Sequence, residues 1–345
     1  MYQTLFIDDL SRLGKLIETH LSEEKERGFF LETSLKAYRL NNLFTPILQR
    51  EALFAICSNY LQRDPLLRWL APYSHLIRER EEQVLIVMAG NLPLVGFHDL
   101  LSVLAAGYRA VVKLSTKDSV LLPAILSLLG EIRDYWRGRV QFVEELLPSH
   151  TIVIATGGDS SANYFNTLFS GKRRVIRGSR SSAALLRGDE GEKEIEGLSK
   201  DLSLYHGMGC RSVSLLLLPT GYRVEQLVQR LGIYASKWLE SDTYFNNYRY
   251  QKALLGMRGI QFIDSGNMLF VESSSLALPI SVVAIGYWNE IEEIDRFIER
   301  EEDKLQAIIN YRFRGEEIDF GESQTPSLWS WADGIDILEF LLKFD

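Results

Sequence analysis

The feature that most constrains this chain is an apolar run at residues 83–90 (QVLIVMAG), which ends in glycine. Such a run suits a β-strand that is buried on both faces, as in a parallel sheet covered by helices on both sides. An amphipathic pattern follows over residues 97–105, and a second strand-like run covers residues 109–115. This alternation of strand and helix predicts an α/β fold with a mostly parallel sheet.

The same alternation continues along the chain. We predict further strands over residues 140–143, 151–156, 175–177, 212–218, 259–264, 268–272 and 280–285. Helices are expected between several of them, for example over residues 224–239 and 290–310. Residues 1–80 carry apolar side chains at helical spacing and are expected to be helical. The charged run at residues 188–200 is interpreted as a solvated loop or a first helical turn.

Composition limits the class of protein. The 345 residues are 46% hydrophobic and 24% charged, which are values of an ordinary globular chain and exclude a disordered one. This length predicts about two domains. Lys and Arg number 38 against 46 Asp and Glu, so the net charge of −8 argues against nucleic-acid binding.

Cysteine, histidine and apolar content narrow the class further. The 2 cysteines and 5 scattered histidines predict neither a disulfide framework nor a metal site. Cys57 lies on an apolar stripe and is expected to be buried. The apolar stretches are too short for a membrane span, and Asp8 and Asp9 stand where a signal peptide needs basic residues. We therefore expect a cytoplasmic protein with no membrane span.

Cys210 is the first candidate for chemistry. It lies in residues 204–214 (LYHGMGCRSVS), after two glycines and before an apolar strand, so its thiol can be exposed where a core thiol cannot. A cation such as Arg211 beside it would favour the nucleophilic thiolate. The residues alone leave two alternatives open, a nucleophile or a structural cysteine in a loop. His206 is a conceivable partner base, but the intervening glycines favour a structural role for it.

Asn91 and residues 151–161 are further candidates, because each ends or follows a predicted strand. Ligands of α/β folds gather at the carboxyl ends of parallel strands. The Asn91 amide would donate a hydrogen bond to a developing oxyanion there, or it would form an Asx turn before Pro93. Residues 151–161 (TIVIATGGDSS) place two glycines and then hydroxyls at a helix start, which favours phosphate oxygens, although an ordinary tight turn is the simpler explanation.

Several segments together resemble a known family. Residues 90–123 (GNLPLVGFHDLLSVLAAGYRAVVKLSTKDSVLLP) resemble the aldehyde dehydrogenase superfamily in their asparagine–proline turn, their helix with a small-residue end and their lysine-bearing strand end. Residues 204–214 are similar to the segment around the nucleophilic cysteine, and residues 320–344 to the C-terminal segment. Within the superfamily, the chain most resembles the long-chain acyl-CoA reductase family, which includes the fatty-acid reductase of bacterial luminescence.

The resemblance implies an aldehyde dehydrogenase-like α/β fold, with a Rossmann-like cofactor domain and a smaller α/β catalytic domain. It implies a helical N-terminus and nucleotide-binding domain over residues 1–205, and a catalytic domain with the cysteine nucleophile over residues 206–312. Residues 313–345 would return to the first domain or make an oligomer contact. The implied partners are an acyl-CoA or acyl-carrier substrate, an acyl-protein synthetase and further copies of the chain in a homo-oligomer.

The resemblance also implies a two-step reduction. The Cys210 thiolate would attack an acyl-CoA thioester while the Asn91 side chain and the Cys210 backbone N–H hold the oxyanion. NADPH, or alternatively NADH, would then reduce the acyl-enzyme to an aldehyde. Lys113 and Ser115 match positions that contact the adenosine ribose. The implied cofactor-binding residues are Lys113, Ser115, Thr156, Gly157 and Gly158, of which the two glycines match the turn that faces the pyrophosphate.

One departure from the superfamily pattern bears on the reaction. Oxidising aldehyde dehydrogenases carry a glutamate that activates water, and the corresponding position here is Ile176. Without a base, attack by water should be slow and thiol exchange should dominate. The leading hypothesis is therefore an NADPH-dependent acyl-CoA reductase that forms an aldehyde. The alternatives are an oxidising aldehyde dehydrogenase and a non-catalytic acyl- or nucleotide-binding partner of a biosynthetic complex.

Overall fold

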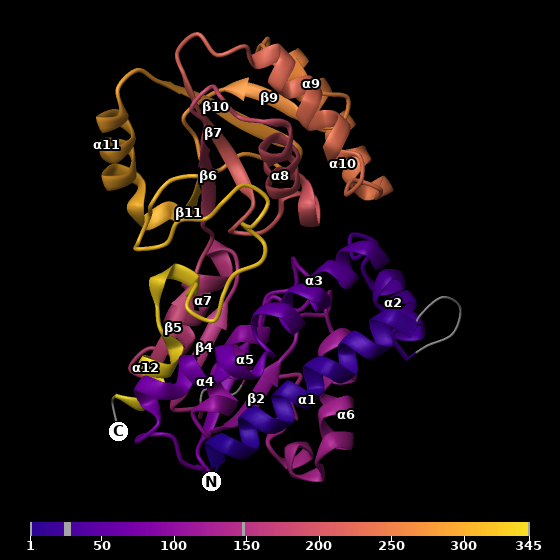
Figure 1. The fold of residues 1–345 in the computed structure, drawn as a ribbon, viewed down its shortest axis with the longest axis vertical. Helices are drawn as coiled ribbons and strands as arrows, with labels where there is room; N and C mark the ends of the chain where they lie inside the picture. The colour runs from indigo at the N-terminus through magenta and orange to yellow at the C-terminus, as the bar shows by residue number, and fades with distance from the viewer. Residues whose placement is uncertain (1, 24–28, 147–148, 344–345) are drawn as a thin grey trace. The chain divides into compact units, whose positions relative to one another are not determined.

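The computed structural model describes residues 2–23, 29–146 and 149–343, and it divides into two compact units (Figure 1). The first unit combines Met1–Ser179 with Pro326–Asp345, and the second is Arg180–Thr325. The outermost residues of the expected first and last domains, residues 1 and 344–345, lie outside the described ranges.

The boundary between the units differs from the expected one at residue 205. The chain enters the second unit at Arg180, because residues 181–203 form a strand and a helix of that unit. It returns to the first unit at Pro326, so residues 313–325 stay with the second unit.

Helices precede the first strand, as the periodicity of this region predicts. They are α1 (Tyr2–Glu23), α2 (Phe29–Leu40), α3 (Pro46–Asn59) and α4 (Arg63–Leu70). Phe6, Leu10, Leu13 and Ile17 recur on one face of α1 and are fully buried. Pro46 begins α3, a position where proline is tolerated because the first helical N–H has no intrahelical acceptor.

A parallel sheet forms the centre of the first unit. Its strands, in spatial order, are β3 (Val140–Phe142), β2 (Arg109–Lys113), β1 (Gln83–Val87), β4 (Ile152–Thr156) and β5 (Arg173–Arg177). Every neighbouring pair is parallel. The chain runs outward from β1 to β2 and β3, then restarts on the other side of β1 with β4. Such a reversal leaves room for a ligand at the carboxyl ends of β1 and β4.

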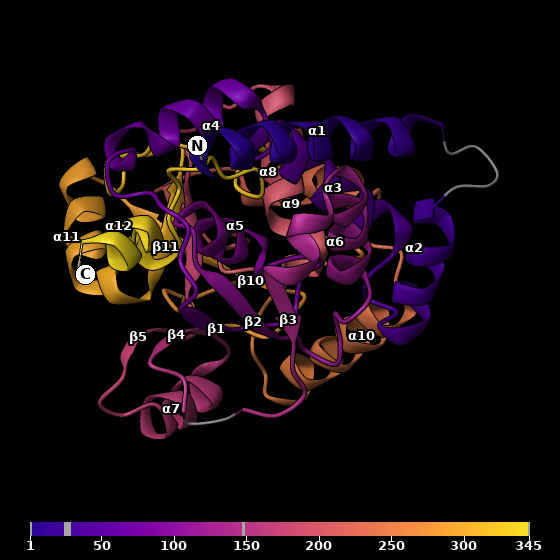
Figure 2. The ribbon, with the colours of Figure 1, turned by 90° about the horizontal axis from the view of Figure 1, so that it is seen from below.

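Helices cover both faces of this sheet. They are α5 (Phe97–Ala105), α6 (Leu121–Ile132), α7 (Asp159–Leu168) and, from the end of the chain, α12 (Ile337–Leu342). Val84 and Ile86 of β1 pack in the core with α5 and α6, whereas Leu85 and Val87 pack in the core with α7. Figure 2 shows α5 and α6 on one side of the strands and α7 on the other. This double cover explains why β1 is apolar at consecutive positions.

The second unit has a sheet of its own. Its strands, in spatial order, are β11 (Leu305–Ile309), β6 (Ser181–Leu185), β7 (Val213–Pro219), β10 (Val282–Trp288), β9 (Leu269–Glu272) and β8 (Ile263–Asp264). Neighbours are parallel except β8 and β9. One face packs with α8 (Glu192–Ser203), α9 (Val224–Ala235) and α10 (Asp242–Met257), and the other with α11 (Ile291–Glu301). The α/β fold class is confirmed.

The run at residues 188–200 is not the loop or first helical turn that its charge predicts. Most of it is α8, whose start is stabilised by the Gly191 N–H, which donates to the Glu194 carboxylate at 2.7 Å. Ile195 and Leu198 are fully buried, so an apolar stripe under the charged face decides the structure.

Strands β6 and β11 were missed by sequence reasoning. The helix expected over residues 290–310 ends at Glu301, and residues 305–309 are strand β11 instead. β11 pairs in parallel with β6, whose serines and alanines have little intrinsic strand preference. Burial between neighbouring strands therefore outweighs the local pattern in both segments.

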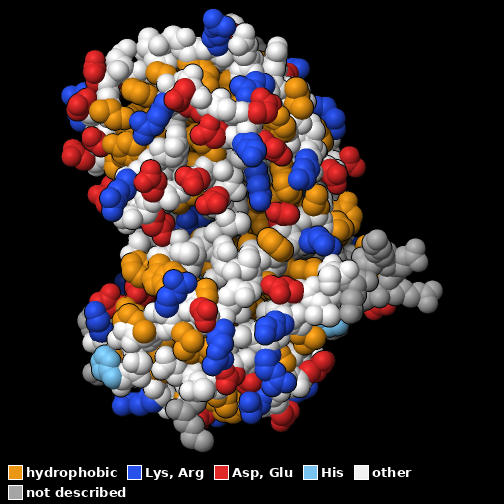
Figure 3. Space-filling model, viewed as in Figure 1, with side chains coloured by type: hydrophobic (Ala, Val, Ile, Leu, Met, Phe, Trp, Pro, Cys, Tyr) orange, Lys and Arg blue, Asp and Glu red, His pale blue; other side chains and the backbone are white. Residues whose placement is uncertain are grey.

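Charged side chains of both signs are interspersed over the molecular face drawn in Figure 3. This mixture agrees with the modest net charge of −8. No helix within the described ranges has both the length and the apolar character needed to cross a bilayer.

Candidate active-site elements of the two units

The expected cofactor and oxyanion residues of the first unit lie along one edge of its sheet. Asn91 follows β1, Lys113 ends β2 and Thr156 ends β4. β1 lies between the other two strands, and all three are parallel, so their carboxyl ends meet at the same edge. Ser115 lies just after β2 and Gly157 just after β4, at the same edge. The predicted residues of the first unit therefore lie along one edge of the sheet.

Asn91 is exposed in the loop that joins β1 to α5. Gly90 before it closely approaches the segment that follows β2, because a Cβ at that position would lie 2.3 Å from Ser115 Oγ. On the other side, Leu94 has a left-handed φ of 60°, and its N–H donates to Asp118 Oδ2 at 2.8 Å. The loop is thus anchored on both sides of Asn91, whose side chain stays at the surface.

Asp118, which accepts a hydrogen bond from the loop that carries Asn91, was not singled out from the sequence. Its side chain is only 7% exposed, and Oδ1 has no hydrogen-bond partner in the described residues. Burial raises the pKa of its carboxyl to about 6, and the Leu94 N–H partly offsets this rise. A polar stretch around Asp118 reads as a surface turn, so only the tertiary structure reveals the burial.

Lys113 and Ser115 are half-buried at the carboxyl end of β2. The Lys113 ammonium donates to the Leu114 carbonyl at 3.0 Å, and Ser115 Oγ accepts from the Lys117 N–H at 3.3 Å. An ammonium has three donors, so this arrangement leaves Lys113 able to bind ligand oxygens as well.

The turn after β4 is built by two glycines. The Gly157 N–H donates to the Arg177 carbonyl at 3.2 Å, and a Cβ on Gly157 would lie 2.8 Å from the Ser161 side chain. Gly158 is exposed at the start of α7 and supplies no side-chain cap. The first N–H groups of a helix have no intrahelical acceptors, so this end of α7 suits a phosphate group. Thr156, half-buried, ends the strand before the turn.

Ile176 lies in β5, opposite Ala155 of β4. Its side chain packs against the core beneath α7. An apolar side chain at this position cannot activate water, so the base implied for the oxidising superfamily members is absent from this position.

Cys210 lies in the second unit, at the amino end of β7. Its side chain is partly exposed. The turn over residues 209–212 is ordered: the Ser212 N–H donates to the Gly209 carbonyl at 3.0 Å, and Ser182 Oγ donates to the Cys210 carbonyl at 2.9 Å. The thiol therefore stands on a defined turn just outside the strand.

The other two side chains considered from sequence have packing roles. His206 is 1% exposed, and its ring stacks on Tyr244 with the centroids 5.4 Å apart. Cys57 is fully buried, and burial raises the pKa of its thiol to about 12. Cys210 is thus the accessible thiol and Cys57 the protected one.

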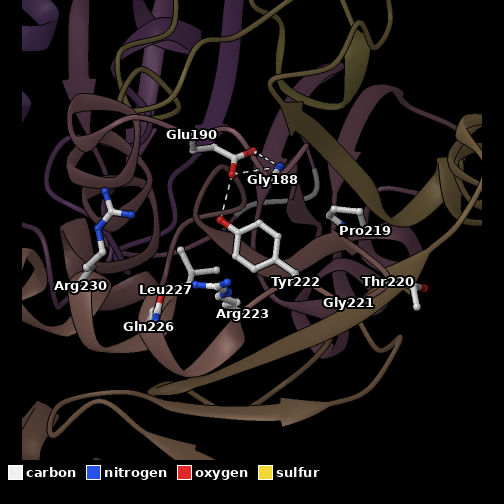
Figure 4. Close-up of a pocket in the computed structure, with 10 residues that line it drawn as sticks. All are labelled: Gly188, Glu190, Pro219, Thr220, Gly221, Tyr222, Arg223, Gln226, Leu227 and Arg230. Carbon is white, nitrogen blue, oxygen red and sulfur yellow. Dashed lines mark hydrogen bonds between the residues drawn. The ribbon is translucent and has the colours of Figure 1, made fainter.

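A recess in the second unit has a volume of about 470 Å³ (Figure 4). It lies at the carboxyl ends of β6 and β7 and the start of α9, whereas Cys210 precedes the amino end of β7. In Figure 4 the Tyr222 hydroxyl points at Glu190, to which it donates at 2.9 Å. Because Cys210 lies at the opposite end of β7, this recess does not serve the thiol.

Several features that suit a phosphate-bearing ligand lie on one edge of the first sheet. Gly90 and Gly157 let backbone approach closely, Lys113 supplies a cation, and the uncapped start of α7 supplies N–H donors, all on one sheet edge. Where the chain is described, no group of three or more His, Cys, Asp and Glu side chains is placed to hold a metal ion.

Comparison with solved structures places the fold among aldehyde dehydrogenases. Aldehyde dehydrogenase 21 from Physcomitrella patens, solved with the product succinate, matches with a TM-score of 0.66 at 11% identity, over 99% of this chain and 84% of that one. The NAD+ complex of an aldehyde dehydrogenase from Bacillus cereus matches with a TM-score of 0.59 at 17% identity, over 94% and 80%.

A mutant of aldehyde dehydrogenase C from Pseudomonas syringae, with NAD+ and octanal bound, has a TM-score of 0.57 at 12% identity, over 91% of this chain and 78% of that one. No protein-family model and no curated protein matches the sequence. The chain therefore has an aldehyde dehydrogenase-like fold, and identities this low establish the fold alone.

Proposed function

We propose that this protein is an acyl-CoA reductase that uses NADPH to reduce a long-chain acyl thioester to an aldehyde. The observation that carries the proposal is a partly exposed Cys210 on an ordered turn, within an aldehyde dehydrogenase-like fold. The resemblance in sequence adds that Ile176 occupies the position of the water-activating glutamate. The solved neighbours with bound NAD+ and octanal support a nicotinamide cofactor and an apolar aldehyde.

Cys210 has the role of nucleophile in this proposal. Its thiolate adds to the carbonyl carbon of the thioester, the bond from that carbon to the CoA sulfur breaks, and CoA leaves as a thiol after taking up a proton. The Asn91 amide and the Cys210 N–H donate to the oxyanion that forms on the carbonyl oxygen. The proposal therefore requires Asn91 and Cys210 to act on the same carbonyl.

The residues at the carboxyl edge of the first sheet would hold the cofactor. Lys113 and Ser115 would bind the adenosine ribose, and the turn at Thr156, Gly157 and Gly158 would bind the pyrophosphate. When bound, NADPH, or NADH in the same place, supplies the hydride that converts the acyl group to an aldehyde. Cys210 is released as a thiolate at that point and is ready to accept another acyl group.

Ile176 determines the fate of the acyl-enzyme in this proposal. Its side chain packs in the core beneath α7 and cannot take a proton from water. Hydrolysis to the acid is then slow, and the thioester persists until it is reduced or returned to a thiol.

Mass spectrometry of the intact protein tests the proposal. Incubation with palmitoyl-CoA, without cofactor, is expected to add one palmitoyl mass to the wild type and to the Cys57→Ser variant, and none to Cys210→Ser. Addition of NADPH should remove the adduct and release hexadecanal. An adduct that persists in Cys210→Ser, or no adduct on the wild type, would contradict the proposal.

The solved neighbours favour a second candidate, an oxidising aldehyde dehydrogenase, because they include aldehyde dehydrogenases solved with NAD+ or with the product succinate. This function predicts release of acid from octanal and NAD+ in the absence of CoA. Binding of NADPH and acyl-CoA without turnover in either direction would instead indicate the remaining alternative, a non-catalytic acyl- or nucleotide-binding partner of a biosynthetic complex.

A further inference from the structure

The turn that carries Cys210 is closed by one serine. The Ser212 N–H donates to the Gly209 carbonyl at 3.0 Å, and the Gly209 N–H donates back to Ser212 Oγ at 3.1 Å. Ser212 is 2% exposed, so water does not compete for these contacts. The position of Cys210, between the two, depends on where the Ser212 hydroxyl is held.

A residue distant in the sequence holds this hydroxyl. Gln324 Nε2 donates to Ser212 Oγ at 2.9 Å, and the Gln324 side chain is only 8% exposed. A serine oxygen has two acceptor positions. The Gly209 and Gln324 N–H groups fill both, which fixes the oxygen between the turn and the segment that bears Gln324.

The segment before Gln324 is fastened to α8. The Asp201 carboxylate, fully buried in α8, accepts the N–H of Gly321 at 2.6 Å and that of Ser323 at 3.1 Å. The backbones also meet directly, since a Cβ on Gly197 of α8 would lie 2.6 Å from the Phe320 carbonyl oxygen. Residues 320–324 therefore form a fixed brace that runs from α8 to the turn of Cys210.

We propose that Gln324 is a positioning residue for the nucleophile: through Ser212, it holds the turn that presents the Cys210 thiol. This inference rests on the proposed function, in which Cys210 attacks the thioester. In this role Gln324 acts through its hydrogen bond to Ser212 Oγ. Residues 320–323 are held on α8, and Gln324 follows them directly. Its hydrogen bond to Ser212 therefore fixes the orientation of residues 209–212 relative to α8.

The test compares two buried glutamines in the same unit. In a Cys57→Ser background, which leaves Cys210 as the single thiol, we would make Gln324→Leu and Gln251→Leu. Gln251 is also 8% exposed but lies in α10. Three kinds of measurement are made on each variant: the rate of Cys210 alkylation by iodoacetamide from pH 6 to 10, the kinetics of palmitoyl-CoA reduction (kcat and the KM values for palmitoyl-CoA and NADPH), and the melting temperature.

Displacement of the nucleophile lowers the rate of the chemical step and leaves the affinity for the cofactor unchanged. We expect Gln324→Leu to lower kcat by about 10–100-fold, with KM for NADPH within about twofold of wild type. The rate of Cys210 alkylation at a given pH should change as well, because the turn that presents the thiol is no longer held, while Gln251→Leu resembles wild type in both measurements. Equal effects of the two substitutions, or wild-type alkylation and kcat in Gln324→Leu, would overturn the proposal.

Ser212→Ala provides an independent check on the same hydrogen bond. If Gln324 acts through Ser212, the Ser212→Ala and Gln324→Leu effects on alkylation do not add in the double variant. Additive effects would overturn the proposal. If Gln324→Leu does not fold, Gln324→Asn shortens the side chain by one carbon and tests the same contact.

The alkylation measurement separates this inference from the proposed function. If palmitoyl-CoA never acylates the wild type, the proposed function is contradicted. The alkylation profiles of the two glutamine variants still test the role of Gln324 in that case. An acylated wild type with unaltered Gln324→Leu alkylation and kcat contradicts the brace alone.

Discussion

Arg177 Nη1 lies 2.8 Å from both carboxylate oxygens of Asp99, and the two side chains are only 5% and 10% exposed. The pair joins the carboxyl end of β5 to α5. The Arg177 carbonyl also accepts the N–H of Gly157, so this ion pair supports the turn proposed to face the cofactor pyrophosphate. A buried pair of this kind has large consequences when one partner is removed.

Asp99→Asn should therefore be strongly destabilising, because it leaves the Arg177 guanidinium buried without a countercharge. We expect a loss of about 3–5 kcal/mol in the free energy of unfolding, measured by urea titration. Asp8→Asn is the matched control, since Asp8 pairs with Arg63 at the surface and should change stability by less than about 1 kcal/mol. A loss in Asp99→Asn as small as the one expected for Asp8→Asn would show that Arg177 finds another partner.

The buried Asp118 predicts a specific pH dependence of stability. Its pKa rises from 3.8 to about 6 on folding, so the folded state holds this proton more tightly than the unfolded chain does. The stabilising contribution is therefore complete below pH 3.8 and is lost as the pH rises through about 6, by about 3 kcal/mol in total.

Asp118→Asn keeps an oxygen that can accept the Leu94 N–H and removes this titration. We expect the stability of Asp118→Asn, relative to wild type, to increase between pH 4 and pH 6 and to level off above that window. Urea titrations at several pH values measure the difference. Asp134→Asn is the control, because Asp134 has a 95% exposed side chain, and a difference for Asp118→Asn that stays constant with pH would disprove the argument.

The two cysteines should differ in reactivity in the native protein. Cys57 is fully buried with a thiol pKa raised to about 12, whereas Cys210 is half-exposed. Iodoacetamide at pH 8 should modify Cys210 alone, and both thiols after unfolding in urea. Peptide mapping locates the adduct, with Cys57→Ser and Cys210→Ser as paired controls. Native modification of Cys57 first would contradict the assignment.

Two helix glycines should respond oppositely to alanine. A Cβ on Gly197 of α8 would lie 2.6 Å from the Phe320 carbonyl oxygen, whereas nothing lies within 4 Å of one on Gly256 of α10. We expect Gly197→Ala to lower stability by about 1–3 kcal/mol through this clash, and Gly256→Ala to raise it by about 0.5–1 kcal/mol through helix propensity. Melting temperatures of both variants test the prediction, and a stabilising Gly197→Ala would mean that residues 320–321 are free to move away.

Much of the fold is readable from the sequence because it depends on local patterns. The apolar run at residues 83–90 predicts a strand covered on both faces, and β1 is buried in that way. The same logic places Asn91, Lys113 and Thr156 after or at strand ends. Because parallel strands end at a common edge, their proximity in the first unit follows once the strands are known.

The elements that sequence reasoning missed depend on distant partners. β6 consists of small residues and becomes a strand between β7 and β11, and β11 lies where local periodicity indicates helix. Strand pairing and burial supply the free energy in such cases, and neither is visible in a short window of sequence.

The sequence by itself therefore determined the alternation of strands and helices, the strand-end position of the candidate polar residues and the burial of Cys57. The tertiary structure alone decided that Asp118 and Asp201 are buried, that Arg177 pairs with Asp99 and that Gln324 reaches Ser212. Local periodicity is set by neighbours within a few residues. The hydrogen bonds of Arg177 with Asp99 and of Gln324 with Ser212 instead join residues 78 and 112 positions apart, and only the folded chain brings those together.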